Sequence, residues 1–195
     1  MFPSYKCICK QLLCAPHPCA YNSDEVGDMA NCSDVCGKMV LEGEWTTSMI
    51  RNLNIVKSEW GIWHFSIKVD DFEETDKEVK FSAYGFWSFD ANLERIGEWT
   101  LGTVRDDIRK AYFDLCDEMA SRINEVGVSD TRIALAFTEE EGGCGILREA
   151  SAEIVCISGR GLRGITVSNE IYDYTKENLF KLGLRDSTND IEWLQ

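Results

Sequence analysis

The cysteines of this chain are concentrated near its amino-terminal end. Six of the nine lie within the first 36 residues, at Cys7, Cys9, Cys14, Cys19, Cys32 and Cys36. A segment this short cannot bury a hydrophobic core, so we expect covalent or coordinate bonds to hold it together. The sequence therefore predicts a small cysteine-rich segment over residues 1–40 and a main domain over residues 41–195.

These six cysteines supply enough thiolates for one tetrahedral Zn²⁺ ion or, together with His17, for a small metal cluster. No apolar secretion signal opens the sequence, and no apolar run approaches the length of about 18 residues that a membrane-spanning helix needs. We therefore expect a cytoplasmic protein, where clustered cysteines are more often metal ligands than disulfides. Free thiols and disulfide-bonded cysteines are the alternatives.

The spacing of the first four cysteines, C-x-C-x4-C-x4-C, resembles the opening of the cysteine-rich CXC zinc module found in some DNA-binding and chromatin proteins. The spacing of the next two, C-x3-C, is similar to a later step of that module. The resemblance covers about 30 residues and implies zinc binding by these cysteines. Tyr21 stands where the module has another cysteine, and the basic residues that such modules use on DNA are missing, so DNA binding is not implied.

The chain is strongly acidic, with 34 acidic and 20 basic residues and a net charge of −14. Residues 1–40 contribute only −1 of this charge, so residues 41–195 carry −13. Such a surface repels phosphate backbones and anionic lipids, and we expect no direct binding to nucleic acid or to membranes. It would attract a basic protein partner. The simpler interpretation is that the charge keeps the protein in solution.

Hydrophobic patterning predicts a hairpin with an acidic loop. Residues 53–69 show an alternation typical of a strand, and residues 79–89 form a second strand rich in aromatic side chains. The intervening loop is a candidate surface for a basic partner, through Asp70, Asp71, Glu73, Glu74, Asp76 and Glu78. A third strand is expected at residues 95–100.

The clearest helical pattern covers residues 103–126, where apolar residues recur at i, i+3, i+4 and i+7 between a capping Thr103 and Gly127. Short strands are expected at 132–138, 145–148, 152–158 and 162–167, and a second helix at 169–182. This grouping predicts an α+β fold. Its mainly antiparallel sheet would be covered by one long amphipathic helix and a second, C-terminal helix, with the small cysteine-rich segment in front.

Three further patterns could carry chemistry. Residues 159–164 read G-x-G-x-x-G, but β-branched residues follow instead of a helix, so we interpret them as a hairpin turn. Cys144 lies in a glycine-rich loop, and a dyad with His64 is the one cysteine-hydrolase arrangement that the main domain offers. Asp107, Asp114 and Glu118 share one side of the long helix and could hold a cation, although a solvated face explains them as well.

These features favour a non-enzymatic binding protein, an inhibitor of the immunity or anti-defence type that neutralises a basic partner by charge complementarity. Its cysteine-rich segment would hold a structural zinc ion. The alternative is a cysteine- or metal-dependent hydrolase that uses Cys144 and His64 or the cysteine-rich segment. Two histidines in the chain leave little general-base chemistry near neutral pH, so the hydrolase ranks second.

Overall fold

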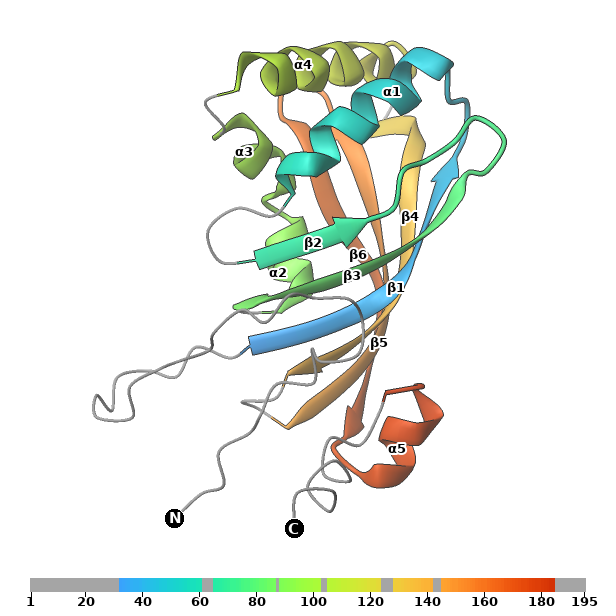
Figure 1. Ribbon diagram of the computed structural model, residues 1–195, viewed down its shortest axis with the longest axis vertical. Coiled ribbons are helices and arrows are strands. Elements are labelled where there is room, and N and C mark those ends of the chain that lie inside the picture. The colour runs from blue at the N-terminus through green and yellow to red at the C-terminus, as the bar shows by residue number, and fades with distance from the viewer. Residues whose placement is uncertain are drawn as a thin grey trace, which may run out of the picture.

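The computed structural model of the chain describes residues 32–60, 65–86, 88–102, 105–123, 128–141 and 145–184. In these residues all strands belong to one antiparallel sheet of six strands, in the order β2-β3-β1-β4-β5-β6 (Figure 1). The strands are β1 (Cys32–Glu42), β2 (Phe65–Val69), β3 (Glu78–Phe86), β4 (Val128–Glu141), β5 (Ile146–Ile157) and β6 (Gly161–Asp173). The helices are α1 (Thr47–Val56), α2 (Phe89–Leu93), α3 (Ile96–Leu101), α4 (Asp106–Ala120) and α5 (Lys176–Lys181), with a 3₁₀ turn at Lys57–Glu59. The predicted α+β class with an antiparallel sheet is confirmed.

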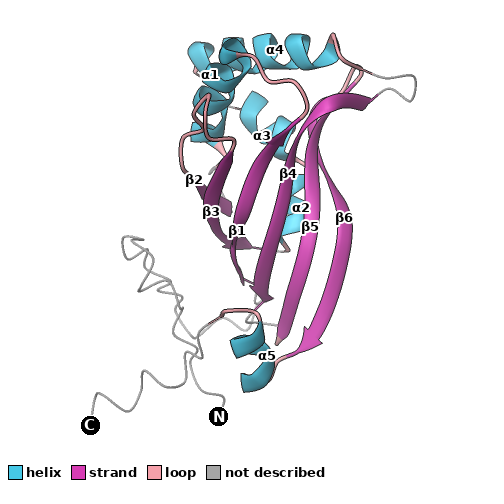
Figure 2. Cartoon of the chain, turned by 90° about the vertical axis from the view of Figure 1, so that its right-hand side faces the viewer, coloured by secondary structure: helices cyan, strands magenta, loops and turns pink. Residues whose placement is uncertain are grey.

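Helices α1 to α4 cover one face of the sheet (Figure 2). Alternate residues of the central strands point to this face, and they include the buried Met39 of β1 and Ile133 and Phe137 of β4. Leu53 of α1 and Leu115 of α4 are fully buried in the same core. Each such side chain contributes about 1.5–3 kcal/mol through the apolar surface that it removes from water.

Helix α5 lies apart from the other four helices, at the opposite end of the sheet (Figures 1 and 2). The ammonium group of its Lys181 lies 4.3 Å from the centre of the Tyr172 ring. Tyr172 pairs with Leu147 on β5, next to Arg148, and successive residues of a strand point to opposite faces. Since Arg148 contacts α2, Lys181 and Tyr172 lie on the face that α1 to α4 leave uncovered.

One of the predicted strands is helical in the structure, and another is helical in its first part. Most of residues 53–60 belong to α1 and the 3₁₀ turn, so β2 is shorter than expected. The buried residues of α1 recur every three to four positions, and Thr46 caps the helix by accepting a hydrogen bond from the Met49 N–H. The strand expected at residues 95–100 is wrong, because Ile96–Leu101 forms α3. Its Gly97 lies directly against the Leu162 carbonyl oxygen, so tertiary packing holds this helix on β6.

The C-terminal helix is shorter than expected, because residues 169–173 pair with β5 as the end of β6. Thr175 then caps α5 through a hydrogen bond from the Asn178 N–H. Within the predicted helix at 103–126, α4 runs over 15 residues. The division expected after residue 40 falls inside β1, so residues 32–40 are part of the sheet.

Candidate functional site

The acidic loop between β2 and β3 is anchored to α1 and to the 3₁₀ turn that follows it by two polar side chains, Asn54 and Lys57. Asn54 donates a hydrogen bond from Nδ2 to the Phe72 carbonyl at 2.9 Å, and its Oδ1 accepts one from the Phe72 N–H at 3.0 Å. The Phe72 side chain is buried in the core at 3% exposure. The Lys57 amine donates to the carbonyls of Val69 and Asp70 at 2.8 and 2.9 Å. These contacts fix the backbone of the loop.

The carboxylates of this loop fall into two groups. Lys57 Nζ lies 2.6 Å from Asp71 Oδ1, and Lys38 Nζ lies 2.7 Å from Glu78 Oε1, so these two acids are neutralised. The others are exposed, and within the described residues none of them forms an ion pair: Asp70, Glu73, Glu74 and Asp76. The structure therefore presents a row of unneutralised negative charge on a fixed backbone.

The predicted metal ligands are only partly covered by the described residues. Cys7, Cys9, Cys14 and Cys19 lie outside them, and Cys32 is described in its backbone alone, at the start of β1. The Cys36 thiol lies on β1, 3.2 Å from the Thr138 hydroxyl. In the described ranges, no group of three or more His, Cys, Asp or Glu residues is placed so that it could hold a metal ion. The zinc site stays a prediction.

The hydrolase alternative rests on residues outside the described ranges, since both Cys144 and His64 are among those not described. The helix carboxylates, in contrast, have partners. Asp107 binds Arg105 at 2.8 Å, and this hydrogen bond lowers the pKa of Asp107 below its usual value. Asp114 binds Lys110 at 2.5 Å, and Glu118 accepts a hydrogen bond from Thr46 at 2.9 Å. This pattern fits a solvated helix face.

A buried cluster of charges was missed by the sequence analysis. Arg148 of β5 is 8% exposed and places Nη1 3.1 Å from Asp90 of α2 and 3.6 Å from Glu139 of β4. Its Nη2 lies 3.0 Å from Glu141. Three carboxylates thus surround one guanidinium group. The signal was present in the sequence, because the alternation that buries residues 133, 135 and 137 continues in phase to 139 and 141.

Glu139 is the most buried member of this cluster, at 0% exposure. Its Oε1 accepts a hydrogen bond from the Phe89 N–H at 2.7 Å, whereas its Oε2 and Arg148 Nε have no hydrogen-bond partner in the described part of the chain. Burial raises the pKa of Glu139 above its usual value. The cluster joins α2 to β4 and β5, and we assign it the role of holding α2 on the sheet.

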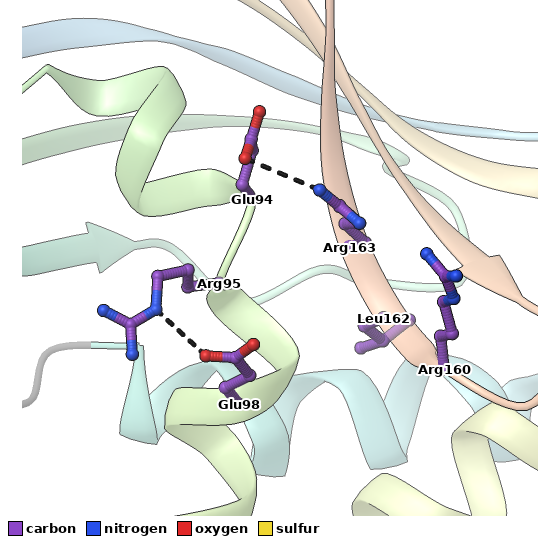
Figure 3. A pocket seen from close by; sticks show the side chains of 6 residues that line it. All are labelled: Glu94, Arg95, Glu98, Arg160, Leu162 and Arg163. Atoms are coloured by element: carbon purple, nitrogen blue, oxygen red, sulfur yellow. Dashed lines mark hydrogen bonds and ion pairs between the residues drawn. The ribbon is translucent and has the colours of Figure 1, made fainter.

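A shallow depression of about 440 Å³ lies between the α2–α3 junction and the β5–β6 turn (Figure 3). Its lining is charged apart from one leucine: Glu94, Arg95, Glu98, Arg160, Leu162 and Arg163. Arg95 binds Glu98 at 2.9 Å and Arg163 lies 3.5 Å from Glu94. Gly159 and Gly161 flank Arg160 at φ values of 70° and 76°, and the turn joins antiparallel strands, so the hairpin interpretation of the glycine motif is confirmed.

Comparison of the chain with protein-family models, with curated proteins and with solved structures gave no match. Among the helices of the described residues, none is both long and apolar enough to cross a lipid bilayer. The case for a function therefore rests on the residues themselves.

Proposed function

We propose that this chain is a cytosolic, non-catalytic binding protein that neutralises a basic protein partner, as an inhibitor of the immunity or anti-defence type. The observation that carries the proposal is the fixed β2–β3 loop with its unneutralised carboxylates. Its contact residues would be Asp70, Asp71, Glu73, Glu74, Asp76 and Glu78. The partner would be a protein with a strongly basic surface, for example a nuclease.

The anchoring of the loop supports a binding role because an ordered surface loses little conformational entropy when it binds. Asn54 holds the loop at Phe72, and Lys57 holds it at the carbonyls of residues 69 and 70. Glu73 and Glu74 are exposed beyond these anchors. Their charges can therefore act on an approaching partner without a preceding rearrangement of the loop.

The charge of the whole chain supports the same proposal. Residues 41–195 carry −13, so the long-range field attracts a basic protein and accelerates its diffusional encounter. The same field opposes the approach of nucleic acid and anionic membranes. A basic enzyme that binds nucleic acid would thus meet a surface that competes with its own substrate for the same positive groups.

The proposal retains a structural zinc ion in the amino-terminal segment. Its ligands would come from the six cysteines given above. For Cys36 to be one of them, the zinc ion would have to lie at the sheet surface next to Thr138. Elemental analysis of the purified chain tests this part separately. A zinc content near one per chain supports it, and a chain without zinc after purification in zinc-containing buffer contradicts it.

The binding function is tested by affinity capture followed by kinetics. The immobilised chain is exposed to a lysate of its source cells, captured proteins are identified, and the captured protein is purified for association measurements. Two double variants are compared, Glu73→Lys/Glu74→Lys in the loop and Glu170→Lys/Glu177→Lys as a control at other exposed positions. Both raise the net charge by four units from −14, so they differ in the position of the change.

We expect a basic captured protein whose association rate falls at least about tenfold with the loop variant at low salt and much less with the control. The rate for the unaltered chain should also fall steeply as the salt concentration rises. Capture of a neutral or acidic protein, or equal rates for the two variants, would contradict the proposal.

A further inference from the structure

Two cysteines of the folded domain meet where α4 packs on the sheet. Cys116 lies on α4 and is half-buried, and Cys156 lies on β5 and is 3% exposed. The Cys156 thiol donates a hydrogen bond to the Cys116 carbonyl oxygen at 3.6 Å. Cys156 belongs to the buried core, and Cys116 packs against that core. Both are free thiols.

The two thiols also interact with each other. Interaction with the Cys116 side chain lowers the pKa of Cys156, and interaction with Cys156 together with burial raises the pKa of Cys116. Of the two thiols, Cys156 therefore ionises more readily than Cys116. This difference favours oxidation of the pair as a unit, because a thiolate is the nucleophile in thiol oxidation and the Cys156 sulfur lies directly against the residue that carries the second thiol.

We propose that Cys116 and Cys156 are a redox modification site, at which a peroxide-class oxidant forms a reversible disulfide between α4 and β5. The proposal is independent of the binding function. In a cytosol rich in thiol reductants the resting state is the pair of free thiols, and the disulfide forms transiently when peroxide is present.

The reaction balances without any group supplied by the protein beyond the two thiols. One thiol reduces hydrogen peroxide to water and becomes a sulfenic acid. The other thiol attacks the sulfenic sulfur, the S–S bond forms, and the sulfenic oxygen leaves as a second water. Hydrogen peroxide gains two electrons, one from each sulfur. A dithiol reductant reverses the change by thiol–disulfide exchange.

The structural consequence follows from the positions of the two residues. A bond from 116 to 156 closes a chain loop of about 40 residues and fastens the helix layer to the sheet, which reduces the entropy of the unfolded chain. For a domain of this size, we expect the thermal midpoint of unfolding to rise by about 10 °C.

The sequence offers a direct test by peptide mapping. Trypsin releases residues 111–122 and residues 149–160 as two separate peptides, and each contains one cysteine. The full chain is purified under reductant, treated with hydrogen peroxide, alkylated, digested and examined by mass spectrometry. We expect a peptide pair linked through Cys116 and Cys156 that separates when dithiothreitol is added before digestion.

A matched control variant and the thermal midpoint of unfolding complete the experiment. Cys36→Ser removes the third described thiol and should leave both the linked pair and the rise in thermal midpoint unchanged. Cys116→Ser should abolish both. The proposal is wrong if peroxide leaves both peptides alkylated, converts their cysteines to sulfinic acids without linkage, or links them mainly to other cysteines of the chain.

Discussion

The side-chain amide of Asn54 pairs with the backbone of Phe72 in both directions, as one strand residue pairs with another across a sheet. Nδ2 donates to the Phe72 carbonyl at 2.9 Å, and Oδ1 accepts from the Phe72 N–H at 3.0 Å. Asp70 and Lys77, at the two ends of the loop, bond to the backbones of Lys80 and Leu41, but no backbone hydrogen bond to a strand is formed by residues 71–76 in the described structure. A residue of α1 therefore supplies the hydrogen bonds that the backbone needs at the buried Phe72.

Replacement of Asn54 by Ala should release the acidic loop. The change removes both hydrogen bonds and leaves the backbone N–H and carbonyl of the buried Phe72 unpaired, so we expect a loss of about 1–3 kcal/mol in the free energy of unfolding. Urea denaturation measures this loss, and amide hydrogen exchange at Phe72 should become faster. Asn52→Ala is the matched control on the same helix, with an expected change within about 0.5 kcal/mol. Equal effects of the two variants would show that the pairing is unimportant.

The stabilising role of Lys57 should come from its carbonyl contacts rather than from its ion pair with Asp71. The lysine side chain is 6% exposed, whereas that of Asp71 is 80% exposed, so solvent screens the pair. Lys57→Met removes the donor for two backbone carbonyls and should cost about 1–3 kcal/mol. Asp71→Asn should cost about 0–1 kcal/mol. Urea denaturation of both variants decides between the two origins, and a larger effect of Asp71→Asn would contradict this assignment.

Two glycines of the α3 region should differ in how much stability they lose on substitution by Ala. A Cβ atom at Gly97 would meet the Leu162 carbonyl oxygen and lie 2.8 Å from the Tyr112 hydroxyl oxygen. Gly97→Ala should therefore destabilise the protein by about 1–3 kcal/mol, despite the better helix propensity of Ala.

Gly102, at the end of α3, has a φ of −69°, and a Cβ there would come no closer than 3.3 Å to the Trp99 carbonyl oxygen. Gly102→Ala should leave stability within about 0.5 kcal/mol or raise it slightly. Thermal unfolding of the two variants is the measurement. Similar midpoints would mean that α3 can move away from β6.

The close approach of Gly97 to Leu162 explains why α3 could not be predicted from the sequence. Residues 95–100 contain isoleucine, tryptophan and threonine, which favour strands locally, and the helix is held by its approach to a residue more than 60 positions later. In contrast, β4 was predicted, because its buried residues 133, 135 and 137 alternate within one short segment. Local periodicity identified the elements that carry their own pattern, and it failed where distant packing decides the conformation.

The acidic loop and the buried charge cluster also differ in how far they could be predicted from the sequence. The acidic loop is contiguous, so its residues could be named from the sequence, but the sequence could not show which of them Lys38 and Lys57 neutralise. The buried cluster draws Asp90, Glu139, Glu141 and Arg148 from three elements, and only the sheet register and the position of α2 bring them together.

The variant Glu139→Gln should gain stability relative to the unaltered protein as the pH rises. Burial raises the pKa of Glu139 above its ordinary value of 4.5, and the neighbouring Glu141 acts in the same direction. The nearby Ser33 hydroxyl, the hydrogen bond from the Phe89 N–H and the charge of Arg148 oppose this shift without cancelling it, and Asp90 adds a further negative charge to the cluster.

A carboxyl group whose pKa is higher in the folded state than in the unfolded state binds protons more tightly when folded. The contribution of Glu139 to the free energy of unfolding is therefore fully present below pH 4.5, and it is lost as the pH rises through the pKa of the folded state. Glutamine carries no charge at either pH and still accepts the hydrogen bond from the Phe89 N–H. The free energy of unfolding of Glu139→Gln, minus that of the unaltered protein, should thus increase between pH 4 and pH 8.

Urea denaturation at several pH values in this range measures the difference. Asp114→Asn, at a more exposed position of α4, serves as the control for the loss of one negative charge from the whole protein, and its effect is subtracted. A difference that falls with increasing pH would show that the attraction of Arg148 for the Glu139 carboxylate exceeds the cost of its burial. The cluster would then stabilise the fold as an ion pair, and the pKa of Glu139 would lie below its ordinary value.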